Sequence, residues 1–121
     1  MITLSIRHMI IIYATMDSKE PVSDEAMRTC VDFQNGSLTE PGCLGYLFTR
    51  DFETPERLHV LERWESEKDL QTHMGSPRSA EFAKWMNERA ASVKVNRFVA
   101  EDQSDDFRRH SAELMGDSVQ T

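Results

Sequence analysis

No apolar run in this sequence is long enough to cross a membrane. The longest run covers residues 9–14, whereas a membrane-spanning helix needs about 20 mostly apolar residues. The run also lacks the Ala-x-Ala cleavage pattern that ends a secretory signal peptide. We therefore expect a cytoplasmic protein with no membrane partner.

Cysteine is scarce, and the two thiols do not form the pattern of a disulfide framework or a metal site. Cys30 falls in a predicted helix and Cys43 at the start of a predicted strand, so we expect both to be reduced. The histidines show no ligand spacing such as His-x-x-x-His; they are His8, His59, His73 and His110. A glycine-rich phosphate loop is also missing. The sequence therefore predicts no metal site.

Positive charge is in short supply. The chain has 14 Lys and Arg against 21 Asp and Glu, which gives a formal net charge of −7. Residues 101–121 hold six of the acids against only Arg108 and Arg109. Because nucleic acid and anionic lipid repel an acidic chain, we expect neither as a partner.

Turn residues divide the chain into alternating strands and helices. Ser23 and Ser66 are predicted to cap helices, and Pro77 is predicted to begin another, because these residue types favour helix starts. Pro41-Gly42 ends the first helix. Residue alternation and β-branched content predict strands over residues 7–15, 43–50, 57–64 and 92–101.

The order βαββαβ predicts an α+β fold, a ferredoxin-like sandwich in which helices cover one face of a four-stranded antiparallel sheet. Residues 1–101 form this domain, and residues 102–121 form an acidic tail that is frayed or reaches the partner subunit. The uncovered sheet face is predicted to carry Met9, Ile11, Tyr13, Leu47, Leu61 and Phe98. So much apolar surface predicts a homodimer formed through the sheet face.

One strand and the helix after it predict a pocket wall. The two-residue period puts Val60, Glu62 and Trp64 on one side of the sheet. The helical period places an apolar-plus-histidine face over that side, made of Leu70, His73 and Met74. Trp, His and Glu among apolar neighbours could bind a flat organic molecule and move a proton.

Four short motifs in this order resemble the antibiotic biosynthesis monooxygenase family. They are Pro41-Gly42-Cys43-Leu44-Gly45-Tyr46, Glu62-x-Trp64, His73, and Ser76-Pro77, within about residues 8–101. The resemblance implies a dimeric α+β barrel, with a pocket between each sheet and its own helices. It also implies oxygenation of an electron-rich aromatic without metal or flavin, in which the protein orients the ring and stabilises its anion.

The chain departs from this family at Arg78, where many relatives carry His after Ser-Pro. An arginine there could stabilise a substrate enolate or carboxylate, but it could not act as a base at neutral pH. Arg78 is therefore predicted to bind substrate. This substitution weakens the inference that the chain shares the catalytic activity of its relatives.

His73 and Tyr46 are the predicted catalytic residues. His73 could accept a proton because histidine titrates near neutral pH, or it could simply hydrogen-bond within its helix. Tyr46 could donate to a developing oxyanion, or it could be a core residue with its hydroxyl at the rim.

Three further residues are predicted to bind substrate. Trp64 could stack on a planar ring or belong to the core. Glu62 could face the substrate, or it could pair with Arg97 or Arg78, because an unpaired buried carboxylate is costly. His8, at the start of the first strand, could line the pocket mouth or face solvent.

The first functional hypothesis is a cofactor-independent monooxygenase that uses O₂ as co-substrate on a small aromatic quinol or polyketide-like molecule. Heme breakdown on the same fold is a rival, but similar heme-degrading relatives use a first-strand Asn and a late-helix His, which this chain lacks. We therefore do not expect heme. A non-catalytic dimeric binder of an aromatic ligand is a second rival, and an isomerase of small carbonyl compounds is a third.

Overall fold

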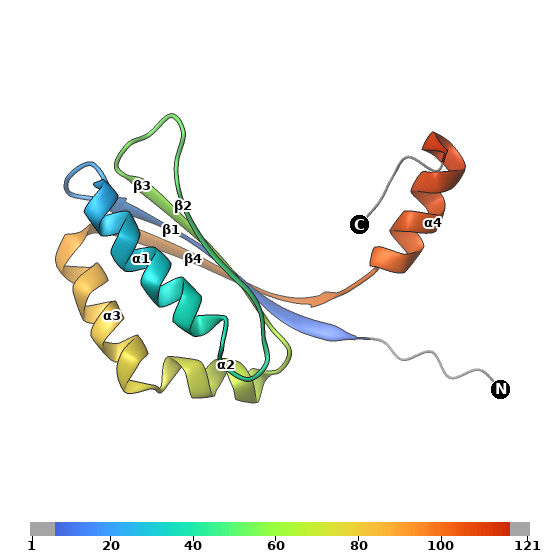
Figure 1. Cartoon of the computed structure of the whole chain (residues 1–121), viewed down its shortest axis with the longest axis horizontal. Coiled ribbons are helices and arrows are strands. Elements are labelled where there is room, and N and C mark those ends of the chain that lie inside the picture. The colour runs from blue at the N-terminus through green and yellow to red at the C-terminus, as the bar shows by residue number, and fades with distance from the viewer. Residues whose placement is uncertain (1–6, 117–121) are drawn as a thin grey trace.

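The computed structural model describes residues 7–116 and forms the predicted α+β sandwich with one added helix (Figure 1). The strands are β1 (His8–Ser18), β2 (Cys43–Arg50), β3 (Arg57–Trp64) and β4 (Ala90–Glu101). The helices are α1 (Asp24–Ser37), α2 (Glu67–Met74), α3 (Pro77–Arg89) and α4 (Ser104–Met115). The βαββαβ order predicted from the sequence is confirmed.

The sheet is antiparallel throughout, in the order β2-β3-β1-β4. β1 lies in the interior of the sheet, between β3 and β4. Its register pairs Ile10 with Trp64 and Ile12 with Glu62 on β3. The same two β1 residues pair with Val99 and Arg97 on β4.

The predicted helix starts are confirmed by their capping bonds. The hydroxyl oxygens of Ser23 and Ser66 accept hydrogen bonds from the backbone N–H of Ala26 and Asp69, respectively. Pro77 follows the capping residue Ser76 and begins α3. Each cap satisfies a backbone donor that the first helical turn leaves unpaired.

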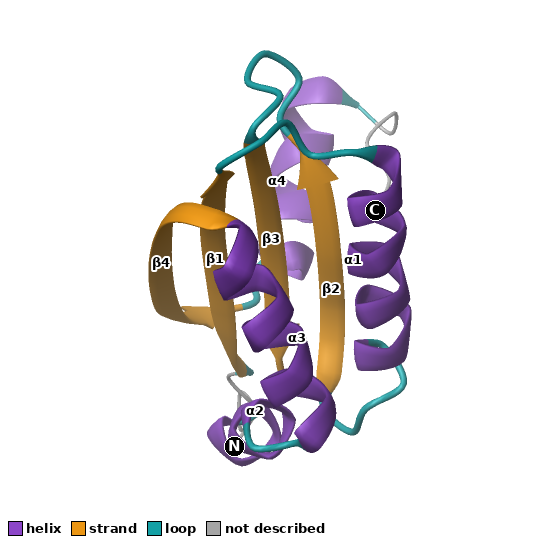
Figure 2. Cartoon of the chain, turned by 90° about the vertical axis from the view of Figure 1, so that its left-hand side faces the viewer, coloured by secondary structure: helices purple, strands orange, loops and turns teal. Residues whose placement is uncertain are grey.

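α1 and α3 cover the same face of the sheet (Figure 2). The rings of Phe33 on α1 and Phe82 on α3 stack with centroids 4.0 Å apart, which joins the two helices. The fully and nearly fully buried apolar residues between helices and sheet are Ile10, Met16, Val22, Cys30, Phe33, Tyr46, Phe48, Leu58, Trp64 and Leu70. Both cysteines, Cys30 and Cys43, are free thiols, as expected.

Among residues 7–116, no helix covers the opposite face of the sheet, since α1, α2 and α3 lie on the other side and α4 stands away from it (Figure 1). Tyr13, Leu47, Leu61 and Phe98 are 38%, 49%, 42% and 51% exposed there. At its β2–β3 turn end the face becomes polar: the Tyr13 hydroxyl lies 2.7 Å from His59 Nδ1, and His59 Nε2 lies 2.8 Å from Asp51 Oδ2. We call this set the Tyr13–His59–Asp51 chain. The bare apolar face is as predicted, and the dimer through it remains a prediction.

One strand residue is exposed by a register shift, and one residue predicted to face the sheet does not. Leu44 is 43% exposed because the register between β2 and β3 shifts between Cys43 and Gly45, so that Leu44 falls in the irregularity. Met74 is 60% exposed because the short helix α2 turns only Leu70 and His73 inward.

The acidic tail contains a helix, α4, which lies beyond the end of β4 and apart from α1, α2 and α3 (Figure 1). Its exposed apolar residues include Phe107 and Leu114. A tail that reaches the partner subunit remains a prediction, and residues 117–121 lie outside the described part. Within residues 7–116, no helix combines the length and apolarity that a membrane crossing requires.

Candidate functional site

Trp64 and His73 pack against each other at the end of β3. Trp64 has no exposed surface and His73 is 4% exposed. Their ring centroids are 4.6 Å apart, and the Tyr46 ring lies 5.5 Å from His73. The pairing predicted from strand and helix periods therefore occurs, and we call Tyr46, Glu62, Trp64 and His73 the Trp64–His73 cluster.

Glu62 is held by neutral donors. Its Oε1 accepts a hydrogen bond from Trp64 Nε1 at 3.0 Å, and the Tyr46 hydroxyl also bonds this carboxyl. Burial raises the pKa of Glu62, and these two hydrogen bonds act against the rise. Burial and the neighbouring Glu62 also raise the pKa of Tyr46, so its phenol stays protonated and donates its hydrogen bond to Glu62.

The ion pair expected for Glu62 is wrong. Arg97 instead pairs with Glu67, and Arg78 pairs with Glu40. Both arginines have partners nearer the surface, where a charged pair loses less hydration than it would beside Glu62.

Glu40 orients His73. Its Oε1 lies 2.8 Å from His73 Nδ1 and 3.0 Å from Arg78 Nη1. A carboxylate accepts hydrogen bonds, so we assign the imidazole proton to Nδ1, which leaves Nε2 as the acceptor. Sequence reasoning missed Glu40, and its only signal was its place directly before the Pro41-Gly42 turn.

Arg78 is bound to α1 as well as to Glu40. Its Nη2 donates to the Phe33 carbonyl oxygen at 2.6 Å, and its guanidinium carbon lies 4.3 Å from the Phe33 ring centroid. Gly36 makes room for it, because a Cβ on Gly36 would lie 2.5 Å from Arg78 Nη2. A substrate contact by Arg78 remains a prediction, and it would compete with these contacts.

His8 does not join the cluster. It lies on β1 two residues before Ile10, which pairs with Trp64, and its side chain is exposed. It lines a separate hollow of about 590 Å³ together with Arg63 and Asp102. Its predicted role at a pocket mouth could apply only to this hollow.

Space for a small molecule occurs beside the cluster. A cavity of about 160 Å³ lies between the sheet and α3, with Phe48, Val60 and Met86 in its wall. An open groove of about 320 Å³ runs between α1 and α3 over Phe33 and Arg78. The cluster residues themselves line neither space, because their side chains pack directly against one another.

The described residues offer no ready metal site. Between residues 7 and 116, no three His, Cys, Asp or Glu side chains come together as candidate ligands. The chemistry that the cluster can supply is proton transfer at His73 and hydrogen-bond donation from Tyr46.

Solved structures share this fold. A conserved protein from Methanosarcina mazei Go1 superposes with a TM-score of 0.69 at 27% identity, over 76% of this chain and 92% of that one. A candidate antibiotic biosynthesis monooxygenase from Deinococcus radiodurans gives a TM-score of 0.64 at 21% identity, over 77% and 93%. One from Caulobacter crescentus CB15 gives 0.68 at 23%, over 79% and 92%.

The sequence itself carries the family signature. No curated protein matches the chain. The model of the antibiotic biosynthesis monooxygenase family matches residues 9–85, which include β1 to β3, α1, α2 and most of α3. That match covers more than half of the chain and all four residues of the Trp64–His73 cluster. The chain therefore belongs to the antibiotic biosynthesis monooxygenase family.

Proposed function

We propose that this protein is a cofactor-independent monooxygenase that oxidises a small aromatic quinol or polyketide-like substrate with O₂. The observation that carries the proposal is the buried imidazole of His73, oriented by Glu40 at 2.8 Å and packed against Trp64. In a member of this family, such a group is suited to accept a proton from an acidic substrate.

The reaction needs no electrons from the protein. His73 Nε2 accepts a proton from the substrate, and the substrate anion passes one electron to O₂. The resulting radical pair combines to form a carbon–oxygen bond, and the peroxide anion takes the proton back from His73. The hydroperoxide then loses water, with the hydrogen of the same ring carbon, which leaves one oxygen atom as a carbonyl on the ring. Tyr46, kept protonated by its raised pKa, would turn its single O–H from Glu62 to the developing anion and donate a hydrogen bond to it.

The substrate ring is proposed to enlarge and occupy the cavity beneath α3, whose volume of about 160 Å³ is below the roughly 300 Å³ at which small-molecule sites begin. Phe48 forms part of that cavity's wall, and its ring lies 5.6 Å from Tyr46. To reach His73, the substrate would have to part the rings of Phe33 and Phe82, which are stacked at 4.0 Å. Closure of these rings behind the substrate would exclude water from its anion.

Oxygen uptake tests this proposal. With menadiol or anthrone as substrate, His73→Gln should lower kcat by about 10²–10⁴-fold, the range for loss of a general base. His59→Gln is the matched control, because His59 also bonds a carboxylate at 2.8 Å but lies on the bare face. The proposal fails if the native protein does not exceed the rate of protein-free autoxidation with any quinol or anthrone analogue.

A second candidate is a non-catalytic binder of an aromatic ligand. It is favoured by the complete burial of Trp64, which makes the cluster resemble core more than an open site. This function predicts that an aromatic ligand binds without oxygen uptake and that His73→Ala leaves its affinity nearly unchanged. Calorimetric titration under argon, followed by oxygen uptake in the same sample, separates the two functions.

We also propose a homodimer through the bare sheet face. The support is the apolar surface of Tyr13, Leu47, Leu61 and Phe98, which is larger than scattered surface residues would produce. A second copy of the same face would cover it by isologous pairing.

A further inference from the structure

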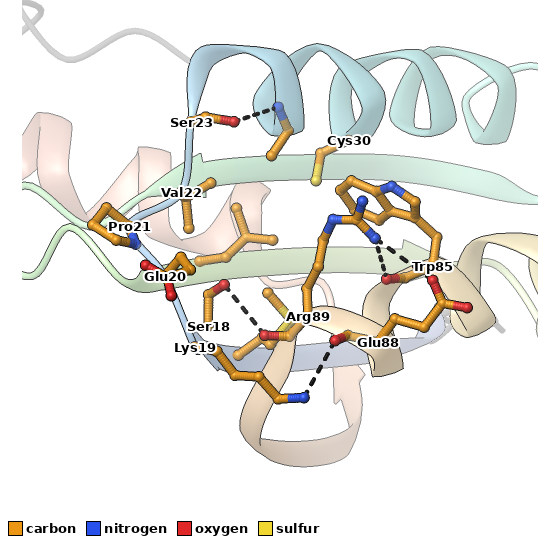
Figure 3. A pocket seen from close by; sticks show the side chains of 13 residues that line it. Ser18, Lys19, Glu20, Pro21, Val22, Ser23, Cys30, Trp85, Glu88 and Arg89 are labelled. Carbon is orange, nitrogen blue, oxygen red and sulfur yellow. Dashed lines mark hydrogen bonds and ion pairs between the residues drawn. The ribbon is translucent and has the colours of Figure 1, made fainter.

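A cavity of about 330 Å³ lies at the end of the sandwich where β1 leaves the sheet and α1 begins. The end of β1, the loop over residues 19–23, the first turns of α1 and the last turn of α3 surround it (Figure 3). Its lining includes no residue of the Trp64–His73 cluster. The cavity is thus separate from the Trp64–His73 cluster, although both lie on the side of the sheet that the helices cover.

The floor of this cavity is apolar. Met16, Val22, Cys30 and Leu58 line it and are each at most 8% exposed. Burial raises the pKa of the Cys30 thiol to about 11, so this side chain is neutral at physiological pH. Figure 3 shows the Cys30 sulfur and the Trp85 ring facing the same space. Such walls favour the apolar part of a ligand.

The rim of the cavity carries two cations at the α3 end. Lys19 Nζ donates to the Glu88 carbonyl oxygen at 3.4 Å, and no carboxylate between residues 7 and 116 pairs with it. The Arg89 guanidinium lies 4.2 Å over the Trp85 ring and donates to the Trp85 carbonyl oxygen at 2.9 Å. Each cation therefore retains donors that a ligand could use.

Two carboxylates share the rim and set its charge balance. Glu88 lies 4.0 Å from Arg89, at the outer limit of an ion pair. Glu20 lies beside Pro21, across the pocket from Trp85 (Figure 3). The α3 end therefore has two cations against one carboxylate, which favours an anionic group there.

We propose that this cavity binds a small organic acid, with its apolar ring or short chain against Val22, Cys30 and Leu58 and its carboxylate at Lys19 and Arg89. A volume of about 330 Å³ lies near the lower end of the range of roughly 300–1,000 Å³ for small-molecule sites, so the ligand has one or two rings. The site shares no residue with the Trp64–His73 cluster, and it meets the cavity beneath α3 only at Met16 and Leu58.

The two tryptophans give a direct test. The chain has only Trp64 and Trp85, one at each site, so their indole N–H signals report separately in an ¹⁵N NMR spectrum. Titration with 2-naphthoate should shift the Trp85 signal and leave the Trp64 signal in place. The neutral 2-naphthamide should bind more weakly. A shift of Trp64 alone, no shift at all, or equal binding of acid and amide would each overturn the proposal.

Paired variants locate the ligand within the protein. Ala26→Leu fills this cavity and should weaken 2-naphthoate binding by about tenfold or more, whereas Ala83→Leu fills the neighbouring cavity beneath α3 and should not. Equal weakening by both would contradict the site. Both variants add the same bulk, and thermal unfolding shows whether either has lost its fold.

A second pair of variants tests the charge at the rim without changing a core residue. Lys19→Gln removes an exposed cation from the cavity rim and should weaken 2-naphthoate binding about two- to fivefold, with no effect on 2-naphthamide. Lys84→Gln, an exposed lysine on α3 outside the cavity lining, should leave both affinities unchanged. Equal effects of Lys19→Gln on acid and amide would show that the carboxylate does not lie at this rim.

Discussion

Each face of the sheet carries side chains that are unusual for their surroundings. The face under α1 and α3 buries Glu62 and His73 among aromatic rings, whereas the open face presents Leu47 and Phe98 to solvent. Buried polar groups cost free energy unless they are paired, and exposed apolar groups cost free energy unless they are covered. The first face therefore points to chemistry within one chain, and the second to contact with another chain.

The largest expected effect belongs to the covered face. Trp64→Ala should lower the free energy of unfolding by about 3–5 kcal/mol, because it removes a side chain with no exposed surface. Trp85→Ala is the control and should cost less, since Trp85 is only partly buried. Urea denaturation measures both. Equal losses would mean that the Trp64–His73 cluster is packed no more tightly than the helix surface.

A substitution on the bare sheet face should change the association of two chains instead of the folding of one. Leu47→Asp should weaken the proposed dimer about hundredfold, because each copy would bury a charge against apolar surface. Leu38→Asp is the control, because Leu38 is 45% exposed and Leu47 is 49% exposed, but Leu38 lies at the end of α1. This variant should leave the dimer intact. Sedimentation velocity across a concentration series reads the result. A monomeric native protein would contradict the proposed interface directly.

Removing the charge of Glu40 beside His73 should have a smaller effect on stability. Glu40→Gln should cost about 1–3 kcal/mol of unfolding free energy, because a hydrogen-bonded carboxylate between His73 and Arg78 is replaced by a neutral amide. Glu67→Gln breaks an exposed pair with Arg97 and should cost no more than about 1 kcal/mol. Chemical denaturation compares the two. If they cost the same, the Glu40 pair behaves as a surface contact.

The smallest effect concerns the pH dependence of stability. Burial raises the pKa of Glu62, so the folded chain keeps this proton at pH values where the unfolded chain has lost it. Stability from this group is therefore fully present below about pH 4.3, the unfolded value, and falls as pH rises through the folded pKa. Glu62→Gln should flatten that fall. Unfolding in urea from pH 4 to pH 8 tests it, with the exposed Glu65→Gln as control.

Most of the fold could be predicted because its signals are local. Caps at Ser23 and Ser66 and the alternation along β2 and β3 depend only on neighbouring residues. Leu44 could not be placed, because a register shift depends on how two strands meet in space. The edge position of β4 likewise depends on the order of strands in the sheet and not on local signals. It leaves Val95 59% exposed and Val99 66% exposed.

The candidate site was only half visible in the sequence. Trp64 and His73 follow strand and helix periods that run along neighbouring segments, so their meeting could be predicted. Glu40 is 33 residues from His73 and belongs to a loop, where no periodicity indicates direction. The partner predicted for Glu62 was wrong for a different reason: neutral donors, Trp64 two residues away and Tyr46 on the neighbouring strand, bond this carboxyl instead of an arginine.

The Tyr13–His59–Asp51 chain limits which surfaces can seal the open face. Asp51 also accepts backbone hydrogen bonds from Glu53 and Thr54, and with His59 these lower its pKa to about 2, so it stays ionised in any ordinary buffer. A uniformly apolar partner would strip water from this corner and replace none of its bonds. The proposed homodimer must therefore leave this polar corner in contact with water or with polar groups of the second copy.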